Sequence, residues 1–162
     1  MSPSAPAGDG VCFACASVSP ADAAQCEVCG AERVLPGGWR PVRVLARGPA
    51  TATVEVRGAG GRRAVAKVLD VQRLEAWKML ELFERQHEVL QGVDHPGVPA
   101  VLAHGSLDLA GRPHLWLVQA FVDGETLQAR IDRRERFRED EARTLLQGLL
   151  EVLQHLHSMS PP

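Results

Sequence analysis

The stretch Ala64-Val65-Ala66-Lys67-Val68-Leu69 predicts a β-strand that carries a single cation near its centre. Lys67 and Lys78 are the two lysines of a chain that otherwise uses arginine for positive charge. Side chains alternate between the two faces of a strand, so Lys67 shares a face with Val65 and Leu69. A lysine is a compact point charge on a flexible stem, which suits the binding of a phosphate from one side. The alternative is a strand-edge lysine whose ammonium reaches water.

Length and composition indicate one globular domain, or one domain with a small appendage. The chain has 162 residues, of which 45% are hydrophobic and 23% charged, and its net charge of −2 gives no indication of a general polyanion binder. The first ten residues lack the basic start and apolar core of a secretory signal. The apolar run at 115–118 is too short to span a bilayer. We therefore expect a cytoplasmic protein without a membrane segment.

All four cysteines lie near the N-terminus, in the pattern Cys12-Phe-Ala-Cys15, ten residues, Cys26-Glu-Val-Cys29. Two Cys-x-x-Cys knuckles supply the four thiolates of a closed tetrahedral zinc site, and so short a stretch needs such a staple in order to fold. The absence of a secretion signal argues against a pair of disulfides, and the absence of a βαβ pattern argues against a redox motif.

The sequence therefore predicts a zinc finger over residues 10–33. A tail rich in small and polar residues, predicted to be disordered, precedes it at 1–9. A segment with Pro36 and two glycines follows it at 34–38 and is typical of a linker.

The finger resembles the Ran-binding-protein type of zinc finger in its cysteine spacing and in Gly30 and Arg33 after the last cysteine. That family usually has a Trp two residues before the first cysteine and an Asn four residues after the second. This chain has Gly10 and Ser19 at those positions. The resemblance implies a protein or single-stranded RNA as ligand, and a generic zinc ribbon describes the segment equally well.

Residues 39–122 predict three strands, a helix and two further strands. Alternation and turn residues indicate strands at 41–45, 51–56 and 63–69, which form an antiparallel meander. A helix that ends before Pro96 follows, and then strands at 98–104 and 114–122. The apolar face of the helix is predicted from residues at helical spacing, which are Trp77, Leu80, Phe83, His87 and Leu90.

This order of elements resembles the small lobe of a protein kinase. Residues 64–69 resemble the third strand with its phosphate-binding lysine, and residues 82–90 with 94–99 resemble helix C and the turn into the fourth strand. Residues 115–127 resemble the fifth strand, the gatekeeper, the hinge and the start of helix D. The resemblance begins at Trp39 and is closest to bacterial serine/threonine kinases. It implies an α+β fold with a five-stranded antiparallel sheet and helix C.

The resemblance also implies an ATP site, in which Lys67 contacts the α- and β-phosphates. It also implies that Gln119 is the gatekeeper and that the backbone of Ala120 and Val122 binds adenine. Leu45, with Thr53 or Val54, would cover the base.

Three positions depart from the family pattern at this site. The phosphate loop keeps one glycine of three, Gly48, and is followed by Pro49, which has no N–H to donate. Val65 stands two residues before the lysine, where the family favours Ala, and it narrows the adenine slot. Gln86 occupies the helix C position that should hold a glutamate partner for Lys67. A glutamine accepts a hydrogen bond from the ammonium but does not neutralise it.

Residues 123–162 resemble the start of the kinase large lobe. Residues 127–132 predict helix D, and a broad apolar stripe from Glu139 onward predicts helix E. The sequence given stops before the catalytic loop, so the base aspartate, the metal-binding asparagine and the Asp-Phe-Gly aspartate are not among its residues. We therefore expect no catalytic residue in this chain, and magnesium only if the missing half of the kinase exists. The apolar stripe predicts a protein interface or an aggregation risk.

Three functions stay open from the sequence. The first is the N-terminal portion of a zinc-finger serine/threonine kinase, cut short and therefore not catalytic as given. The second is a pseudokinase-type binding module, which the altered loop, Val65 and Gln86 favour. The third is a zinc-finger adaptor whose finger binds protein or RNA, although nothing in the charge of the chain favours nucleic acid.

Overall fold

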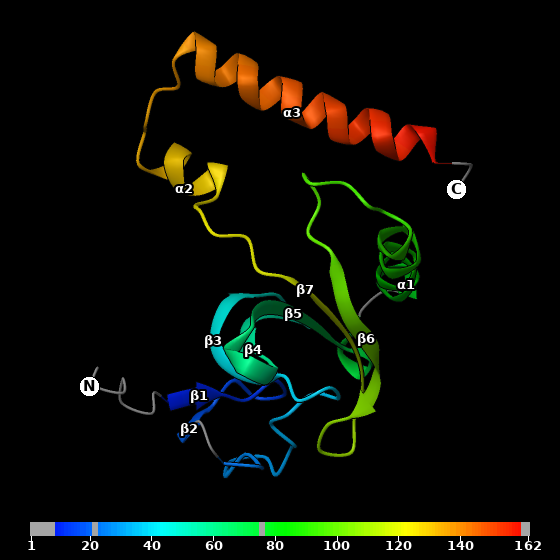
Figure 1. Cartoon of the computed structure of the whole chain (residues 1–162). Helices are drawn as coiled ribbons and strands as arrows, with labels where there is room; N and C mark the ends of the chain where they lie inside the picture. The colour runs from blue at the N-terminus through cyan, green and yellow to red at the C-terminus, as the bar shows by residue number, and fades with distance from the viewer. Residues whose placement is uncertain (1–8, 21–22, 75–76, 160–162) are drawn as a thin grey trace. The chain divides into compact units, whose positions relative to one another are not determined.

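The computed structural model describes residues 9–20, 23–74 and 77–159, which belong to two compact units (Figure 1). The first unit comprises 1–91 and 101–121, and the second comprises 92–100 and 122–162. The tail predicted to be disordered lies outside the described residues except for Asp9.

A five-stranded antiparallel sheet forms the centre of the first unit. The strand order is β3-β4-β5-β7-β6, so the strand that carries Lys67 lies in the middle, paired with β4 and β7. The predicted α+β class and the predicted five-stranded antiparallel sheet are confirmed, and the architecture is compatible with a kinase-like small lobe. The strands are β3 (Arg40–Arg47), β4 (Thr51–Arg57), β5 (Arg63–Asp70), β6 (Val101–Asp108) and β7 (Pro113–Ala120).

Each of the five predicted strands differs from the structure by at least one residue at one end, and the strand predicted at 98–104 differs most. The strand predicted at 98–104 begins at Val101 and continues to Asp108. Its start is later because residues 95–98 form a turn, in which the Val98 N–H donates to the His95 carbonyl at 2.9 Å. The strand predicted at 114–122 ends at Ala120, two residues early.

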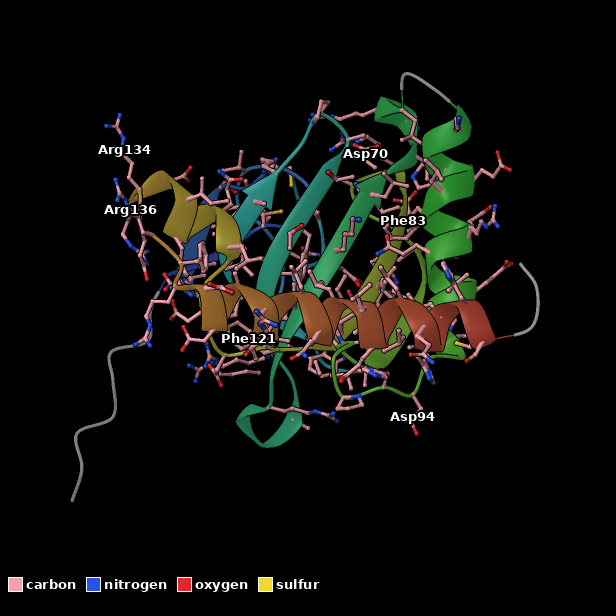
Figure 2. All side chains as sticks on the ribbon, turned by 90° about the horizontal axis from the view of Figure 1, so that it is seen from above. Asp70, Phe83, Asp94, Phe121, Arg134 and Arg136 are labelled. Carbon is pink, nitrogen blue, oxygen red and sulfur yellow. The ribbon has the colours of Figure 1, made fainter. Side chains whose placement is uncertain are left out.

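One face of the sheet packs against helix α1 (Trp77–Gln91). Leu80 and Phe83 of this helix are buried and contact Leu69 and Leu117 of the sheet. Figure 2 shows Phe83 on the side of α1 that faces the strands. The periodicity of these two residues therefore predicted the packing face correctly, whereas the side chains of Trp77 and His87 lie outside the described residues.

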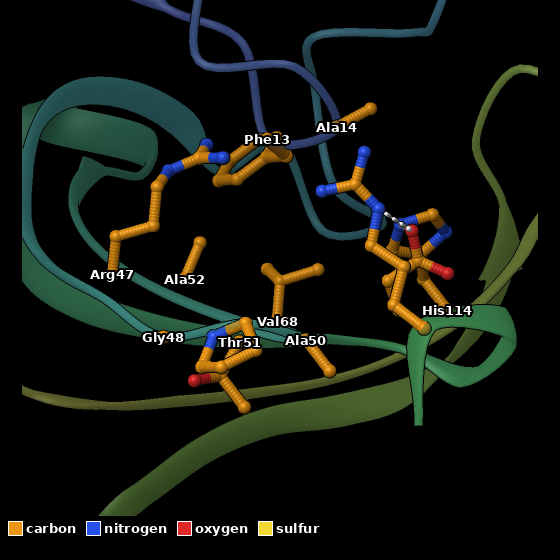
Figure 3. A pocket seen from close by; sticks show the side chains of 12 residues that line it. Phe13, Ala14, Arg47, Gly48, Ala50, Thr51, Ala52, Val68 and His114 are labelled. Carbon is orange, nitrogen blue, oxygen red and sulfur yellow. Dashed lines mark ion pairs between the residues drawn. The ribbon is translucent and has the colours of Figure 1, made fainter. Parts of the chain in front are cut away.

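The opposite face of the sheet packs against the four-cysteine segment (residues 10–33). Its strands β1 (Asp9–Val11) and β2 (Val18–Pro20) form a small antiparallel pair beside β3 (Figure 1). Figure 3 shows Phe13 and Ala14 of this segment opposite Ala52 and Val68 of the sheet. A single apolar cluster, named here the shared core, comprises Cys12, Phe13, Ala14, Cys26, Ala31, Leu35, Trp39, Ala52, Val54, Val56, Ala64, Ala66, Val68, Leu109, Trp116 and Val118.

The connection between the four-cysteine segment and β3 contributes to the shared core. Leu35 and Trp39 are buried, and the Leu35 N–H donates to the Trp39 carbonyl at 3.0 Å to close a tight turn. Trp39 lies so close to Gly58 that a Cβ at that glycine would be 2.6 Å from the indole ring. The β4–β5 connection therefore requires glycine at this position.

The second unit contains helices α2 (Leu127–Asp132) and α3 (Glu139–Ser158). The Thr126 hydroxyl accepts a hydrogen bond from the Ala129 N–H at 3.1 Å and caps α2. The large apolar residues that α3 exposes are Leu145, Leu146, Leu149, Leu150 and Leu153. Among the described helices, none is both long enough and apolar enough to cross a membrane.

The shared core predicts that truncating one side chain of the four-cysteine segment will destabilise the sheet. Phe13 is 2% exposed, so Phe13→Ala in the full chain should lower the free energy of unfolding by about 3–5 kcal/mol. Urea unfolding followed by circular dichroism measures the change. The control Val28→Ala lies in the same segment at 72% exposure and should change stability by less than about 0.5 kcal/mol. If Phe13→Ala left the free energy of unfolding unchanged, that result would contradict the presence of Phe13 in a core shared with the sheet.

Candidate zinc centre and nucleotide-binding face

The four cysteines converge, as their spacing predicted. The Sγ atoms of Cys12, Cys15, Cys26 and Cys29 all lie within 4.8 Å of one another, with 3.7 Å between Cys12 and Cys29 and 3.6 Å between Cys15 and Cys26. A disulfide holds its sulfurs about 2.05 Å apart, so these thiols are not paired with each other. Zinc–sulfur bonds of about 2.3 Å in a tetrahedron place neighbouring sulfurs about 3.8 Å apart. The observed separations therefore fit a metal ion such as zinc.

Two equivalent turns bring the sulfurs together. The Ala16 N–H donates to the Cys12 carbonyl at 3.0 Å, and the Gly30 N–H donates to the Cys26 carbonyl at 2.8 Å. Ala16 and Gly30 both have left-handed backbone conformations, with φ of 61° and 70°. Each Cys-x-x-Cys motif is thus a tight knuckle that turns both of its sulfurs toward the other knuckle.

Hydrogen-bond donors around the sulfurs favour thiolates at part of the cluster. Burial raises the pKa of the Cys12 thiol to about 12. Burial also opposes ionisation of Cys26, but the Ser17 hydroxyl and the backbone N–H groups of Cys29 and Val28 lower its pKa to about 6. The Ser17 Oγ lies 2.9 Å from the Cys26 Sγ and 3.0 Å from the Cys15 Sγ. A bound metal ion would displace the remaining protons, as four thiolate ligands require.

The face of the sheet opposite the shared core carries Lys67. Thr53, Lys67 and Leu117 are direct cross-strand neighbours on β4, β5 and β7, so their side chains point to one face. The Lys67 Nζ donates to the Gln86 Oε1 at 3.2 Å and lies 5.9 Å from the centroid of the Phe83 ring. The structure therefore brings together the strand lysine and the helix residue that the sequence analysis paired.

The next row on this face contains two further predicted residues. Val65 and Gln119 are cross-strand neighbours, and both are partly exposed. Val54 instead pairs with Ala66 and is completely buried in the shared core. Thr53 and Val54 are the two β4 alternatives predicted to cover a base together with Leu45, and of these Thr53 lies on the face of Lys67 and Val54 on the other.

The predicted phosphate loop is a tight hairpin turn. The Gly48 N–H donates to the Thr51 carbonyl at 2.8 Å, so this amide already has a partner. A Cβ at Gly48 would lie 2.7 Å from the Thr51 Oγ1, a contact that rotation of the threonine side chain relieves. Because Pro49 has no N–H, two consecutive residues of the turn offer no free backbone donor to a phosphate.

The remaining predicted residues lie toward the end of a strand or beyond it. Leu45 is 40% exposed and lies at an irregularity in the pairing of β3 with β4. Ala120 is the last residue of β7 and is partly exposed. Val122 belongs to the second unit and is 65% exposed.

A buried carboxylate on the face of Lys67 was missed by the sequence analysis. Glu55 is 4% exposed and pairs across the strands with Val65, one row from Lys67. Its carboxylate accepts hydrogen bonds from Arg43 at 2.8 Å and from Arg63 at 3.1 Å. No local signal in the sequence points to it, because Thr53, Glu55 and Arg57 alternate with Val54 and Val56 as polar residues of an ordinary exposed strand face do.

Comparison with known proteins identifies distant relatives. No protein-family model matches the chain. The chain is similar to CBL-interacting serine/threonine-protein kinase 9 of Arabidopsis thaliana, with 27% identity over 129 residues that cover 79% of this chain and 28% of that protein. Two Oryza sativa subsp. japonica proteins match over 98 residues, which cover 60% of this chain and 21% of each relative: CBL-interacting protein kinase 24 at 28% identity and CBL-interacting protein kinase 9 at 31%.

These similarities support a relationship between this chain and serine/threonine protein kinases, in agreement with the sequence analysis. The chain spans 21% to 28% of the length of these relatives. The bacterial type of kinase and the Ran-binding-protein type of finger stay predictions.

The sulfur geometry predicts that the purified chain will contain about one zinc ion per molecule. Elemental analysis measures this ratio, and Cys26→Ser should lower it strongly because one of the four ligands is lost. Removing zinc with a chelator should lower the unfolding temperature of the chain. Val28→Ala, between two of the cysteines but exposed, is the matched control and should keep the metal. A Cys26→Ser variant that still contained about one zinc ion per molecule would contradict the assignment of the four cysteines as a zinc centre.

Proposed function

We propose that this chain is the N-terminal portion of a zinc-finger serine/threonine kinase and that its first unit is an ATP-binding small lobe. The zinc finger spans 10–33 in this proposal, a linker 34–38, the small lobe 39–122 and the start of the large lobe 123–162. Support comes from the similarity to serine/threonine kinases and from the strand order of the sheet. A bacterial type of kinase and a cytoplasmic location are parts of the same proposal.

The observation that carries the proposal is the contact between Lys67 and Gln86. Lys67 lies on the central strand, and its ammonium is held by a neutral acceptor at 3.2 Å. A glutamine fixes the position of the ammonium without cancelling its charge, so the cation stays available to a phosphate. Phe83, one helical turn before Gln86, is buried against the sheet and fixes α1 beside β5.

Binding of a nucleotide, rather than phosphoryl transfer, is the activity proposed for these residues. The sequence contains neither a His-Arg-Asp nor an Asp-Phe-Gly motif, and phosphoryl transfer relies on magnesium and a base held by such groups. The tight turn at Gly48 and Pro49 weakens the phosphate loop. The altered loop, Val65 and Gln86 equally support the pseudokinase-type binding module as the alternative.

The adaptor alternative receives less support from the packing. Phe13, Ala14 and Ala31 of the four-cysteine segment are buried in the shared core, so this side of the segment is not available to RNA or to another protein. The exposed Val18 and Val28 are the large apolar residues that the segment presents to solvent. The zinc finger is therefore proposed as a structural part of the small lobe.

The proposal predicts that Lys67→Met will weaken the binding of ADP and of tripolyphosphate by about tenfold, because a charged hydrogen bond to phosphate is lost. Isothermal titration calorimetry with the full chain measures both affinities. Lys78→Met is the matched control, since Lys78 is the other lysine and is exposed on α1. It should leave both affinities unchanged.

Two results would count against this role of Lys67. The first is wild-type protein that binds neither ligand. The second is an equal loss of affinity in the Lys67 and Lys78 variants, which would indicate a general effect of net charge.

A further inference from the structure

The buried carboxylate of Glu55 connects three strands on the face of Lys67. Its Oε2 accepts from the Arg43 Nε of β3 at 2.8 Å, and its Oε1 accepts from the Arg63 Nε of β5 at 3.1 Å. Glu55 is 4% exposed, whereas both arginines are more exposed. Each carboxylate oxygen thus has its own cationic donor, which is the condition for burying a charge at low cost.

The chain of contacts continues from Arg63 to the end of β7. The Arg63 guanidinium carbon lies 3.8 Å from the centroid of the Phe121 ring, within the range of a cation–π interaction. Phe121 directly follows Ala120, the last residue of β7. Glu55 therefore orients Arg63, and Arg63 holds the ring that follows the last residue of β7.

The protonation state of Glu55 is consistent with this role. Burial opposes its ionisation, but hydrogen bonds and charge from Arg43 and Arg63 outweigh burial and hold the pKa of this carboxyl below its usual value. The carboxylate is therefore charged at neutral pH and keeps both arginines in place.

We infer that Glu55 is a positioning residue for the base of the nucleotide, acting through Arg63 and Phe121 on the backbone at Ala120. The inference rests on the proposed function, in which this backbone binds adenine. Lys67 lies on the same face, one row away from the Glu55–Val65 pair, and contacts the phosphates in the proposed function. Glu55 thus affects the binding of the base, and Lys67 affects the binding of the phosphates. Substitution of one residue should therefore weaken one of these contacts without weakening the other.

The test compares three probes by calorimetry on the full chain: adenosine, ADP and tripolyphosphate. Glu55→Gln keeps the size of the side chain but removes the charge that holds Arg63. It should weaken the binding of adenosine by about tenfold and lower the ratio of ADP to tripolyphosphate affinity by a similar factor. Tripolyphosphate binding should not be weakened, because the substitution removes a negative charge from the face that carries Lys67. A purely structural defect would lower the binding-competent fraction and so weaken all three probes equally.

Two further variants make the assignment specific. Arg63→Met removes the ion pair and the cation–π contact, and it should reproduce the selectivity change of Glu55→Gln. The double variant should lose no more than either single variant, because both act through one chain of contacts. Arg57→Met is the matched control, since the exposed Arg57 is the cross-strand neighbour of Arg63 on β4. It should leave the ratio of ADP to tripolyphosphate affinity unchanged.

The outcomes separate the inference from the proposed function. Wild-type protein that binds none of the three probes would overturn the proposed function and the inference with it. Wild-type protein that binds ADP, with the same ratio of ADP to tripolyphosphate affinity in Glu55→Gln, would overturn the inference alone. Weaker adenosine binding and a lower ratio of ADP to tripolyphosphate affinity in both variants would support it.

Discussion

The packing of the four-cysteine segment against one face of the sheet is the interaction on which the rest of the first unit depends. β5 is the central strand, and alternation divides its side chains between two environments. Ala64, Ala66 and Val68 are buried in the shared core, and Lys67 faces the other way. Small residues at 64 and 66 leave room for the segment to approach, which large side chains on the same face would prevent. The packing of the four-cysteine segment on the shared-core face therefore leaves Lys67 on the opposite face, although Lys67 does not contact the segment.

The face of the sheet that carries Lys67 combines the apolar packing of α1 with two charged contacts. At the end near α1, Lys67 donates to Gln86, a neutral partner that does not compensate a positive charge. At the other end, Glu55 has two cationic partners and its charge is compensated. The Lys67 end thus presents a cation held by a neutral partner, whereas the Glu55 end, with two arginines for one carboxylate, is an ion-paired support that links three strands. This difference follows from hydrogen-bond partners within a single sheet, and it is the physical basis for the two roles proposed above.

Local patterns in the sequence predicted much of this arrangement, because they depend on spacing along the chain. The cysteine spacing predicted the convergence of four sulfurs, and alternation predicted β5 with Lys67 opposite Ala66. Contacts between distant segments were not predictable in this way. The alternation of side chains along β4 does not say which face of the strand is covered. Which of Thr53 and Val54 shares the face of Lys67 therefore follows only from the packing of the shared core. Glu55 was missed for the same reason, since its two arginine partners lie on neighbouring strands.

The central claim is that the four-cysteine centre and the sheet form one cooperative structure. Native-state amide hydrogen exchange of the full chain, with zinc bound and after chelation, tests it most directly, because exchange reports the opening of individual strands. The account predicts that the amides of Arg63–Asp70 lose protection on chelation together with those around Cys12 and Cys26. Loss of protection confined to residues 10–33, with the β5 amides unchanged, would contradict it.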